Sequence, residues 1–383
     1  MRIAIDCRAF EHLSRYLGIG TYTSNLVQAL ARASGHHQFI PFARAIKQEG
    51  NEVDSSSEHQ VERRGFRIAG KHSLLNQLTR HRVDLCHILE FTPPFAPAHR
   101  AVVTVHDLIP LIFPNIYLPW YGVRTRWNFR AYYRFLREAR QIVAVSQHTK
   151  ADLIRFLNIP QDRIRVIYSG VNPAFRPLSH SWEIEPVLRE YKIPIPYVLY
   201  VGSCDYRKNI PGLMRAFAQF RVGEFEEFHL VLVGKGTELN RESLREYGAG
   251  LGLTHHLHLA GYVPLKQLVA LYNGATLLVY PSFYEGFGFP PLEAMACGVP
   301  AVTSKNSALS EVTGGSALLV DPYDEGELRE AMRRVVLDHG LRKSLIQKGL
   351  AHVWRFSWDR TAQETLRVYD EIGGPVRFQR TRN

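Results

Sequence analysis

Two glutamates stand eight residues apart in the segment PSFYEGFGFPPLEAMACGVPAVTS, which covers residues 281–304. The stretch between Glu285 and Glu293 is rich in glycine, phenylalanine and proline. Glycines allow a backbone to approach a ligand closely, and carboxylates accept hydrogen bonds from the hydroxyl groups of a ribose or another sugar. The residue types and their spacing therefore point to a ligand that carries hydroxyl groups.

The neighbouring residues predict the elements that hold these two carboxylates. Residues 277–280 predict a strand, and a Pro-Pro pair followed by LEAMAC predicts a helix that stops at Gly298. Glu285 then follows the carboxyl end of a strand, where open α/β sheets bind ligands, and Glu293 lies in the first turn of the helix. The free N–H groups of a helix start favour an anion such as a diphosphate. Taken singly, Glu293 could merely stabilise that helix through its dipole.

A basic pair forms the second candidate site. Arg207 and Lys208 lie in VGSCDYRKN, after an apolar run at 197–203 that predicts a strand. On the same sheet edge as Glu285, the two cations could neutralise a diphosphate and stabilise it as a leaving group. By itself an adjacent Arg-Lys pair is more often a solvated turn.

Three segments in the first half of the chain carry further candidates. His106 and Asp107 end the predicted strand AVVTV, where an imidazole could hydrogen-bond a sugar hydroxyl, although a lone His there is more often structural. Gly18 and Gly20 open a predicted helix in GIGTYTSNL, but a lone GxG is a weak signal for nucleotide binding. Ser146 in AVSQHTKADL is typical of a helix N-cap.

Short apolar runs alternate with helical patterns along the whole chain. The predicted strands are RIAIDCRAF, VDLCHIL, AVVTVHDL, QIVAVS and RIRVIYS, then YVLYVGS, FHLVLVG, LHLAGY, ATLLVYPS and PAVTS. Apolar strands joined by helical crossovers predict parallel sheets that are covered on both faces. Because the series occurs twice and 383 residues suit two domains, we expect an α/β protein with two doubly wound domains.

Composition narrows the classes of function. The net charge is +11, and residues 1–190 hold an excess of nine positive charges against two in the remainder. That asymmetry suits an anionic partner, although it could serve solubility alone. The four cysteines show no CxxC spacing, which favours a reducing cytosol over a disulfide framework. No DxD pair and no His/Cys/Asp spacing typical of a metal site is present, nor any nucleic-acid-binding motif, so we expect no metal and no nucleic acid.

The glutamate segment resembles, almost residue by residue, the E-x7-E motif of retaining glycosyltransferases of family 4, which have the GT-B fold. The resemblance extends over nearly the whole chain and is closest to bacterial mannosyltransferase-like members of O-antigen and exopolysaccharide pathways. It implies that Glu293 holds the nucleotide ribose and that Glu285 contacts the donor sugar. The backbone that meets the diphosphate and sugar would be that of Gly286, Phe287, Gly288 and Phe289.

The same resemblance assigns roles to the other candidates. Lys208, preceded by Arg207, stands where the family places its phosphate clamp. Ser203 stands where some members carry a further arginine, so Arg207 could substitute for it. In LVGKG at 232–236, Gly234 falls in a region that the family uses around the nucleobase, together with the turn at 261–264.

On the side of the first domain, the resemblance places His106 against the donor sugar, with Asp107 orienting it or contacting the acceptor. The loop with Gly18 and Gly20 would lie beside the diphosphate and acceptor, and the loop with Ser146 would line the cleft.

The family architecture is two Rossmann-like domains that face each other across a cleft. We expect an N-terminal acceptor-binding domain over 1–175, a linker over 176–196 and a C-terminal nucleotide-sugar-binding domain over 197–357. The segment from about 358 to 383 should cross back as a helix onto the first domain.

The implied reaction moves a sugar, with retention, from a nucleoside-diphosphate sugar to a saccharide or lipid-linked saccharide. The implied donor is GDP-mannose, with UDP-sugars as the alternative. Two other interpretations of the function are a nucleotide-sugar epimerase of the same fold and a non-catalytic scaffold. No cofactor is expected, and the enzyme should be cytoplasmic.

A basic segment suggests an anionic membrane surface as a further partner. PWYGVRTRWNFRAYYRFLREAR places Arg126, Arg130, Arg134 and Arg137 at helical spacing on one face. Such a helix can lie on anionic lipid, or it can be an ordinary amphipathic helix with a charged outer face.

Overall fold

The computed structural model describes residues 1–11, 18–33, 36–44, 66–68, 73–90, 96–119, 122–236 and 238–373. These residues form two compact units, of which the first comprises residues 1–170 and the segment from 358 onward, and the second comprises residues 171–357. Residues 176–196, which the sequence suggests as a linker, belong to the second unit and carry its first helices. The last residues of the expected crossover segment, 374–383, lie outside the described residues.

The first unit is built on a seven-stranded parallel sheet with the order β3-β2-β1-β4-β5-β6-β7. Its strands are β1 (Arg2–Asp6), β2 (Gln38–Arg44), β3 (Phe66–Ile68), β4 (Leu85–Ile88), β5 (Ala101–Val105), β6 (Gln141–Ala144) and β7 (Ile164–Val166). The order reverses between β1 and β4, which is the topology of a Rossmann sheet.

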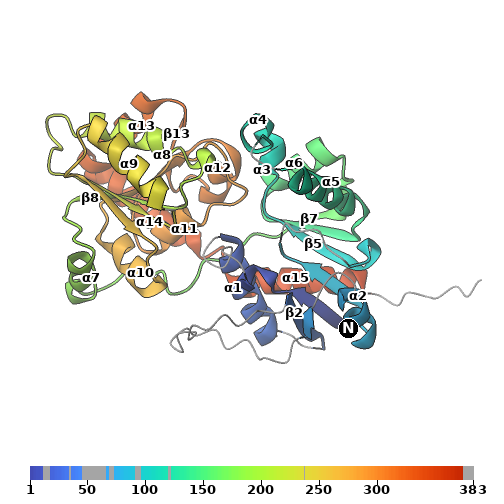
Figure 1. Ribbon diagram of the computed structural model, residues 1–383. Coiled ribbons are helices and arrows are strands. Elements are labelled where there is room, and N and C mark those ends of the chain that lie inside the picture. Colours follow the sequence, from blue (N-terminus) through green and yellow to red (C-terminus); the bar gives the residue numbers. More distant parts are fainter. Residues whose placement is uncertain are drawn as a thin grey trace, which may run out of the picture. The chain divides into compact units, whose positions relative to one another are not determined.

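Helices join and cover these strands (Figure 1). They are α1 (Gly18–Ala33), α2 (Ser73–Arg80), α3 (Ile109–Ile112), α4 (Pro114–Tyr117), α5 (Val123–Glu138), α6 (Gln147–Leu157) and α15 (Trp358–Ile372), with the 3₁₀ turns η1 (Arg8–Glu11), η3 (Ala98–Arg100) and η4 (Gln161–Arg163). The last helix, α15, lies along α1 although more than 300 residues separate them in the chain (Figure 1). It therefore closes one side of the first unit.

The second unit repeats the plan with a six-stranded parallel sheet in the order β10-β9-β8-β11-β12-β13. The strands are β8 (Tyr197–Val201), β9 (His229–Val233), β10 (Leu257–Gly261), β11 (Leu277–Tyr280), β12 (Ala301–Ser304) and β13 (Leu318–Val320). Its order reverses between β8 and β11, so the ends of these two strands mark the crevice in which such sheets bind ligands.

The helices of the second unit pack on this sheet and on one another, with α8 against α13 and α11 against α14. They are α7 (Glu185–Glu190), α8 (Ile210–Phe220), α9 (Glu238–Gly250), α10 (Leu265–Gly274), α11 (Phe289–Ala296), α12 (Ser307–Thr313), α13 (Glu325–Leu337) and α14 (His339–Val353), with the 3₁₀ turns η5 (Ser181–Glu183) and η6 (Tyr206–Lys208). The prediction of two doubly wound α/β domains is confirmed.

The strand sequences are mainly apolar because helices cover both faces of each sheet. Every residue of β4, β5, β11 and β12 is buried, as expected for parallel sheets between two layers of helices. Three strands, β2, β3 and β13, were not among the predicted ones. Two of them, β3 and β13, have only three residues, which is too short for a clear pattern.

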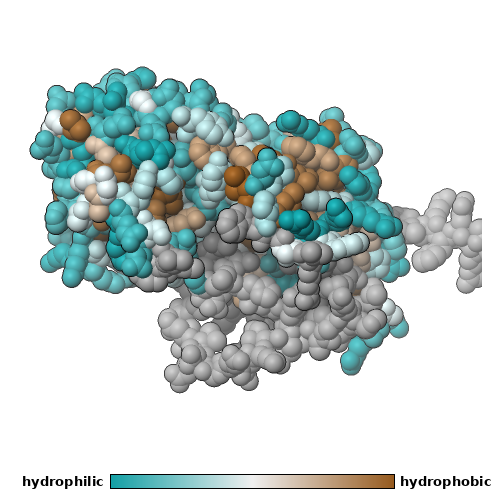
Figure 2. Space-filling view, turned by 45° about the horizontal axis from the view of Figure 1, so that its top comes forward, coloured by the Kyte–Doolittle hydropathy of each residue, from teal (hydrophilic) through white to brown (hydrophobic). Residues whose placement is uncertain are grey.

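Hydrophilic residues cover most of the described surface in the view of Figure 2. None of the helices in the described part of the chain combines the length and the apolar character that are needed to cross a membrane.

Candidate active site

The basic pair and the first glutamate meet in the second unit. Lys208 Nζ lies 2.6 Å from Glu285 Oε1, and Arg207 Nη1 lies 2.5 Å from Glu285 Oε2. Lys208 follows β8 and Glu285 follows β11, the two strands at which the sheet order reverses. Both side chains are buried, with 8% of each exposed. Residues 77 positions apart in the chain thus form one ionic cluster at the crevice of the sheet.

The charges in this cluster perturb one another strongly. Burial by itself would raise the pKa of Glu285, but Arg207 and Lys208 outweigh it and lower that pKa to about 2. Burial and the charge of Arg207 lower the pKa of Lys208 to about 8, although Glu285 opposes them. Asp205 Oδ1 lies 3.6 Å from Arg207 Nε as well, so two cations and two carboxylates meet at the place where a diphosphate would fit, and Glu285 is the buried carboxylate of the two.

Local sequence explains how the cations are positioned. The side chain of Asp205 accepts the N–H of Arg207 at 3.2 Å and caps the single turn η6. Asn209 then takes a left-handed conformation with φ of 54° and ends that turn before α8 begins. The C=O of Arg207 accepts the N–H of Phe283 at 2.7 Å, which ties η6 to the loop that carries Glu285.

Tyrosines beneath the cluster were missed by the sequence reasoning. Lys208 Nζ donates to the hydroxyl of Tyr280, the last residue of β11. The rings of Tyr280 and Tyr200 stack with their centroids 5.8 Å apart. Burial raises the pKa of both hydroxyls well above the usual value, so both stay neutral and act as dipoles. Their place in strands made them look like ordinary core residues.

The glycine turn between the two glutamates has a strict shape. Gly286 and Phe287 are buried, and Gly288 has a φ of 108°, which side chains rarely adopt. A Cβ at Gly288 would also lie 2.5 Å from Leu309 Cδ2. The half-buried Phe289 is the first residue of α11. The N–H of Glu285 donates to Ser307 Oγ at 3.0 Å, so the start of α12 fixes this turn as well.

Glu293 does not lie in the first turn of its helix, and that prediction is wrong. It is the fifth residue of α11, which begins at Phe289. There it is 9% exposed and accepts a hydrogen bond of 2.7 Å from the hydroxyl of Tyr272. Burial raises the pKa of Glu293 to about 7, against a weaker opposing effect of Tyr272. A helix dipole therefore does not account for this carboxylate.

We expect Glu293→Gln to stabilise the unliganded protein at high pH. Because the folded-state pKa is raised from 4.5 to about 7, ionisation costs the fold nothing below pH 4.5 and its full penalty above pH 7. That penalty is on the order of 3 kcal/mol, and the glutamine keeps an acceptor for Tyr272. Thermal denaturation from pH 4.5 to pH 8 measures the effect.

The melting temperature of Glu293→Gln should rise above that of the native protein progressively over this range. Glu242→Gln, at an exposed position of α9, is the matched control and should not change the pH dependence. Parallel curves for the native protein and Glu293→Gln would contradict a raised pKa.

Glycines at the ends of β9 and β10 allow a close approach of three backbones. Gly234 has a φ of 154°, and a Cβ there would overlap the carbonyl oxygen of Gly202. The N–H of Gly234 donates to the C=O of Gly261 at 2.8 Å. Ser203 is half-buried in the loop after β8, and its C=O accepts the hydroxyl of Tyr200 at 3.2 Å. These turns lie at the same sheet edge as the ionic cluster.

The first unit gathers its candidates at the carboxyl edge of its own sheet. His106 follows β5, and its Nε2–H donates to the C=O of Leu89 at 3.0 Å. Burial lowers the pKa of His106 to about 4, so the ring is neutral at pH 7 and Nδ1 carries no proton. Asp107 Oδ1 accepts the N–H of Ile109 at 3.2 Å. The neutral imidazole can accept, through Nδ1, a hydrogen bond from a hydroxyl group.

Ser146 is the N-cap of α6, as predicted, and accepts the N–H of Thr149 at 3.0 Å. Thr149 Oγ1 donates in turn to the C=O of His106 at 3.3 Å, so the cap also supports the histidine. Gly18 and Gly20 form the first turn of α1, with Gly18 exposed and Gly20 buried.

A buried ion pair at the end of β1 was missed by the sequence reasoning. Arg8 Nη2 lies 2.6 Å from Asp6 Oδ2, and Arg8 Nε donates to Asp6 Oδ1 at 2.7 Å. The signal was available, because opposite charges at Asp6 and Arg8 interrupt an apolar strand pattern at its end. Tyr22 of α1 was missed as well, and its ring packs edge-on against His106 with centroids 4.8 Å apart.

Among the described residues, one group of side chains could hold a metal ion, namely His36, His37 and Asp370. Its ligand atoms come from both ends of the first unit, which is why no sequence spacing revealed it. It contains none of the candidate site residues.

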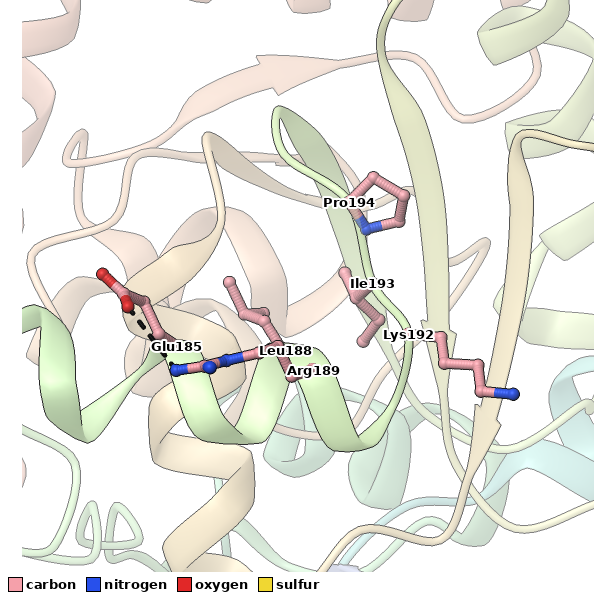
Figure 3. Close-up of a pocket in the computed structure, with 6 residues that line it drawn as sticks. All are labelled: Glu185, Leu188, Arg189, Lys192, Ile193 and Pro194. Carbon is pink, nitrogen blue, oxygen red and sulfur yellow. Dashed lines mark ion pairs between the residues drawn. The ribbon is translucent and has the colours of Figure 1, made fainter.

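A surface hollow of about 540 Å³ lies at the end of α7 in the second unit (Figure 3). Glu185 and Arg189 form an ion pair of 3.8 Å beside it. Its lining consists of Glu185, Leu188, Arg189, Lys192, Ile193 and Pro194. None of the candidate residues lines this hollow.

Two family models and several known proteins are similar to this chain. The model of the family "Glycosyltransferase Family 4" matches residues 16–175, and that of "Glycosyl transferases group 1" matches residues 189–352. The O-antigen chain mannosyltransferase B of Escherichia coli is 33% identical over 370 residues, covering 92% of this chain and 95% of that protein. The chain belongs to glycosyltransferase family 4. This family 4 enzyme is accordingly a glycosyltransferase of the retaining, hexose-transferring type.

Solved structures agree on the fold of this glycosyltransferase. Sucrose-phosphate synthase from Thermosynechococcus elongatus superposes with a TM-score of 0.78 at 23% identity, covering 97% of this chain and 99% of that one. Anabaena HepE in complex with UDP-glucose gives a TM-score of 0.73 at 18% identity and covers 96% and 100% of the two chains. The GT-B fold expected from the sequence is confirmed.

Proposed function

We propose that this glycosyltransferase moves mannose from GDP-mannose onto a saccharide or lipid-linked saccharide acceptor during the synthesis of a cell-surface polysaccharide. The similarity to an O-antigen chain mannosyltransferase over 92% of the chain supports the sugar and the kind of acceptor. Similarity to transferases over this length favours transfer over epimerisation or a scaffolding role.

The observation that carries the proposal is the buried cluster of Arg207, Lys208 and Glu285 at the crevice of the second sheet. The two cations are held by Glu285 and Asp205 before a ligand arrives, so little reorganisation is needed when the leaving diphosphate gains charge. We propose that they provide this charge without a metal ion.

Glu293 supplies the second part of the donor site. A buried carboxylate whose pKa is raised to about 7 is costly to keep for structure alone. We propose that two ribose hydroxyls donate to it, which would favour its ionised form. Nucleotide affinity should then rise with pH toward 7, with release of a proton on binding.

The ionic cluster of Arg207, Lys208 and Glu285 also limits how the enzyme can retain the configuration at the anomeric carbon. Both oxygens of Glu285 are engaged, one by Lys208 and the other by Arg207. Such a carboxylate, with a pKa of about 2, is a poor nucleophile for a double displacement. We propose instead that the acceptor attacks from the face that the diphosphate leaves, and that the diphosphate takes the acceptor's proton.

A thermal-shift panel tests the donor. We expect GDP to raise the melting temperature, and GDP-mannose to raise it further. Each ligand stabilises the folded state because it binds the folded protein and not the unfolded chain. UDP and UDP-glucose serve as matched comparisons at the same concentrations.

If UDP raises the melting temperature and GDP does not, the donor is a UDP-sugar, as in the HepE complex with UDP-glucose, and GDP-mannose is wrong. No shift with any nucleotide would overturn the proposed transferase function for this site.

We further propose that α5 contacts an anionic membrane surface. Arg126, Arg130 and Arg134 are exposed along this helix, and Trp127 beside them is 64% exposed. Replacing the three arginines by serine should reduce sedimentation with vesicles that contain phosphatidylglycerol, because each basic residue near the surface contributes about 1 kcal/mol. Purely zwitterionic vesicles are the control, and equal sedimentation of both proteins would return α5 to an ordinary amphipathic helix.

A further inference from the structure

Three aromatic rings meet at the carboxyl edge of the second sheet. Tyr206 follows β8, Phe283 follows β11 and Tyr323 follows β13. The rings of Phe283 and Tyr323 stack with centroids 4.5 Å apart and an interplanar angle of 14°. Tyr206 joins them, with its centroid 5.5 Å from that of Phe283. These three residues are called the aromatic platform below.

The aromatic platform is open to solvent. Tyr323 is 65% exposed and Tyr206 is 52% exposed, whereas Phe283 is half-buried between them. Tyr200 and Tyr280 at the same sheet edge are fully buried, whereas the exposed Trp182, Tyr262 and Trp354 lie elsewhere in the second unit. Single exposed aromatics are common, but a contiguous group beside a ligand site marks a binding surface.

The aromatic platform adjoins the ionic cluster. Tyr206 directly precedes Arg207, and the N–H of Phe283 donates to the C=O of Arg207 at 2.7 Å. In the sheet order β10-β9-β8-β11-β12-β13, the glycine turns after β9 and β10 lie on one side of the ionic cluster and Tyr323 lies on the other. The aromatic platform therefore extends away from the glycine turns at Gly234 and Gly261.

Polar groups border the aromatic platform. Asp321 accepts the N–H of Tyr323 at 3.0 Å and pairs with Lys305 at 3.2 Å, with 34% and 48% of the two side chains exposed. Asp205 lies on the other border with 35% of its side chain exposed. A pyranose ring presents C–H groups on its faces and hydroxyls at its edge. An aromatic surface bordered by carboxylates and an ammonium group matches both features.

We propose that the aromatic platform binds sugar units of the acceptor glycan beside the diphosphate site. The inference rests on the proposed function and names a place for the acceptor on the second unit. The stacked rings would carry one or two pyranose rings, while Asp321 and Asp205 accept hydrogen bonds from their hydroxyls.

Saturation-transfer NMR on the full-length protein tests the proposal, with mannotriose and maltotriose as probes. We expect transfer to mannotriose, reduced at least five-fold in Tyr323→Ala and retained in Tyr323→Phe, which keeps the ring. Trp182→Ala is the matched control, because Trp182 is 68% exposed and stacks on His180 elsewhere in the same unit. The control should leave the transfer unchanged.

Calorimetry with GDP and UDP on the same proteins separates this inference from the proposed function. Tyr323→Ala should bind the nucleotide as the native protein does. If nucleotide binding weakens together with glycan binding, the aromatic platform belongs to the donor site and the inference is overturned. No transfer to either trisaccharide, or equal transfer in Tyr323→Ala, would overturn it as well. A native protein that binds glycan but no nucleotide would instead defeat the proposed transferase function.

Discussion

Replacing Lys208 by alanine should lower turnover by roughly 10²–10³-fold, which is the usual loss when one fixed donor to a developing anion is removed. The ammonium group lies 2.6 Å from Glu285 Oε1 and is positioned before the donor binds. Its loss leaves Arg207 as the remaining cation of the cluster. Release of nucleoside diphosphate from the donor, measured at saturating donor, gives the turnover.

The pH dependence of nucleotide binding adds a second readout for Lys208. Because its pKa is lowered to about 8, the cation is present below pH 8 and is lost above it. Nucleotide affinity of the native enzyme should therefore fall as the pH rises beyond 8, and Lys208→Ala should lack this fall. Lys348→Ala, at an exposed position of α14, is the control. Normal turnover in Lys208→Ala would remove this lysine from the diphosphate site.

Glu285→Gln should weaken the fold and the reaction while sparing the affinity for nucleoside diphosphate. The change leaves the buried Lys208 without the carboxylate of Glu285, while the part-buried Arg207 keeps Asp205. Removing one partner of a buried pair costs roughly 3–5 kcal/mol. An arriving diphosphate would supply the missing negative charge, so affinity for it should be equal or higher. Turnover should fall at least ten-fold, since the carboxylate that holds Arg207 and Lys208 in position is absent. Calorimetry and steady-state kinetics on one preparation compare the two effects.

The stability effect of Glu285→Gln has a defined pH window. The folded-state pKa of Glu285 is lowered from 4.5 to about 2, so its contribution is full above pH 4.5 and is lost as the pH falls toward 2. The gap in free energy of unfolding between native protein and variant should be widest at pH 5–7 and should close in acid. Glu246→Gln, at an exposed site of α9, should show no gap. A gap that does not depend on pH would mean that Glu285 is not held as a carboxylate.

The success of the sequence reasoning followed the strength of the local patterns. Long apolar runs such as YVLYVGS and ATLLVYPS predicted the strands that carry the site, because a strand buried on both faces needs apolar residues throughout. The short strand β13 left no such pattern, and its loop carries Tyr323. The prediction that Glu293 lies in the first turn of its helix was wrong because α11 begins at Phe289, one residue before the Pro-Pro pair. Helix ends depend on one or two residues, so they are the least certain part of a pattern.

By itself the sequence determined the class of fold, the repetition of the sheet and the segments that carry chemistry. Those properties depend on residues that are neighbours along the chain, and the order of such residues can be read from the sequence. Tertiary structure alone decided that Lys208 meets Glu285 across 77 positions, that burial raises the pKa of Glu293 to about 7 and that His36, His37 and Asp370 meet. It also brought Tyr206, Phe283 and Tyr323 together from three strand ends. Distances and solvent exclusion arise from packing between distant segments, and both the pairing of charges and their pKa values follow from these.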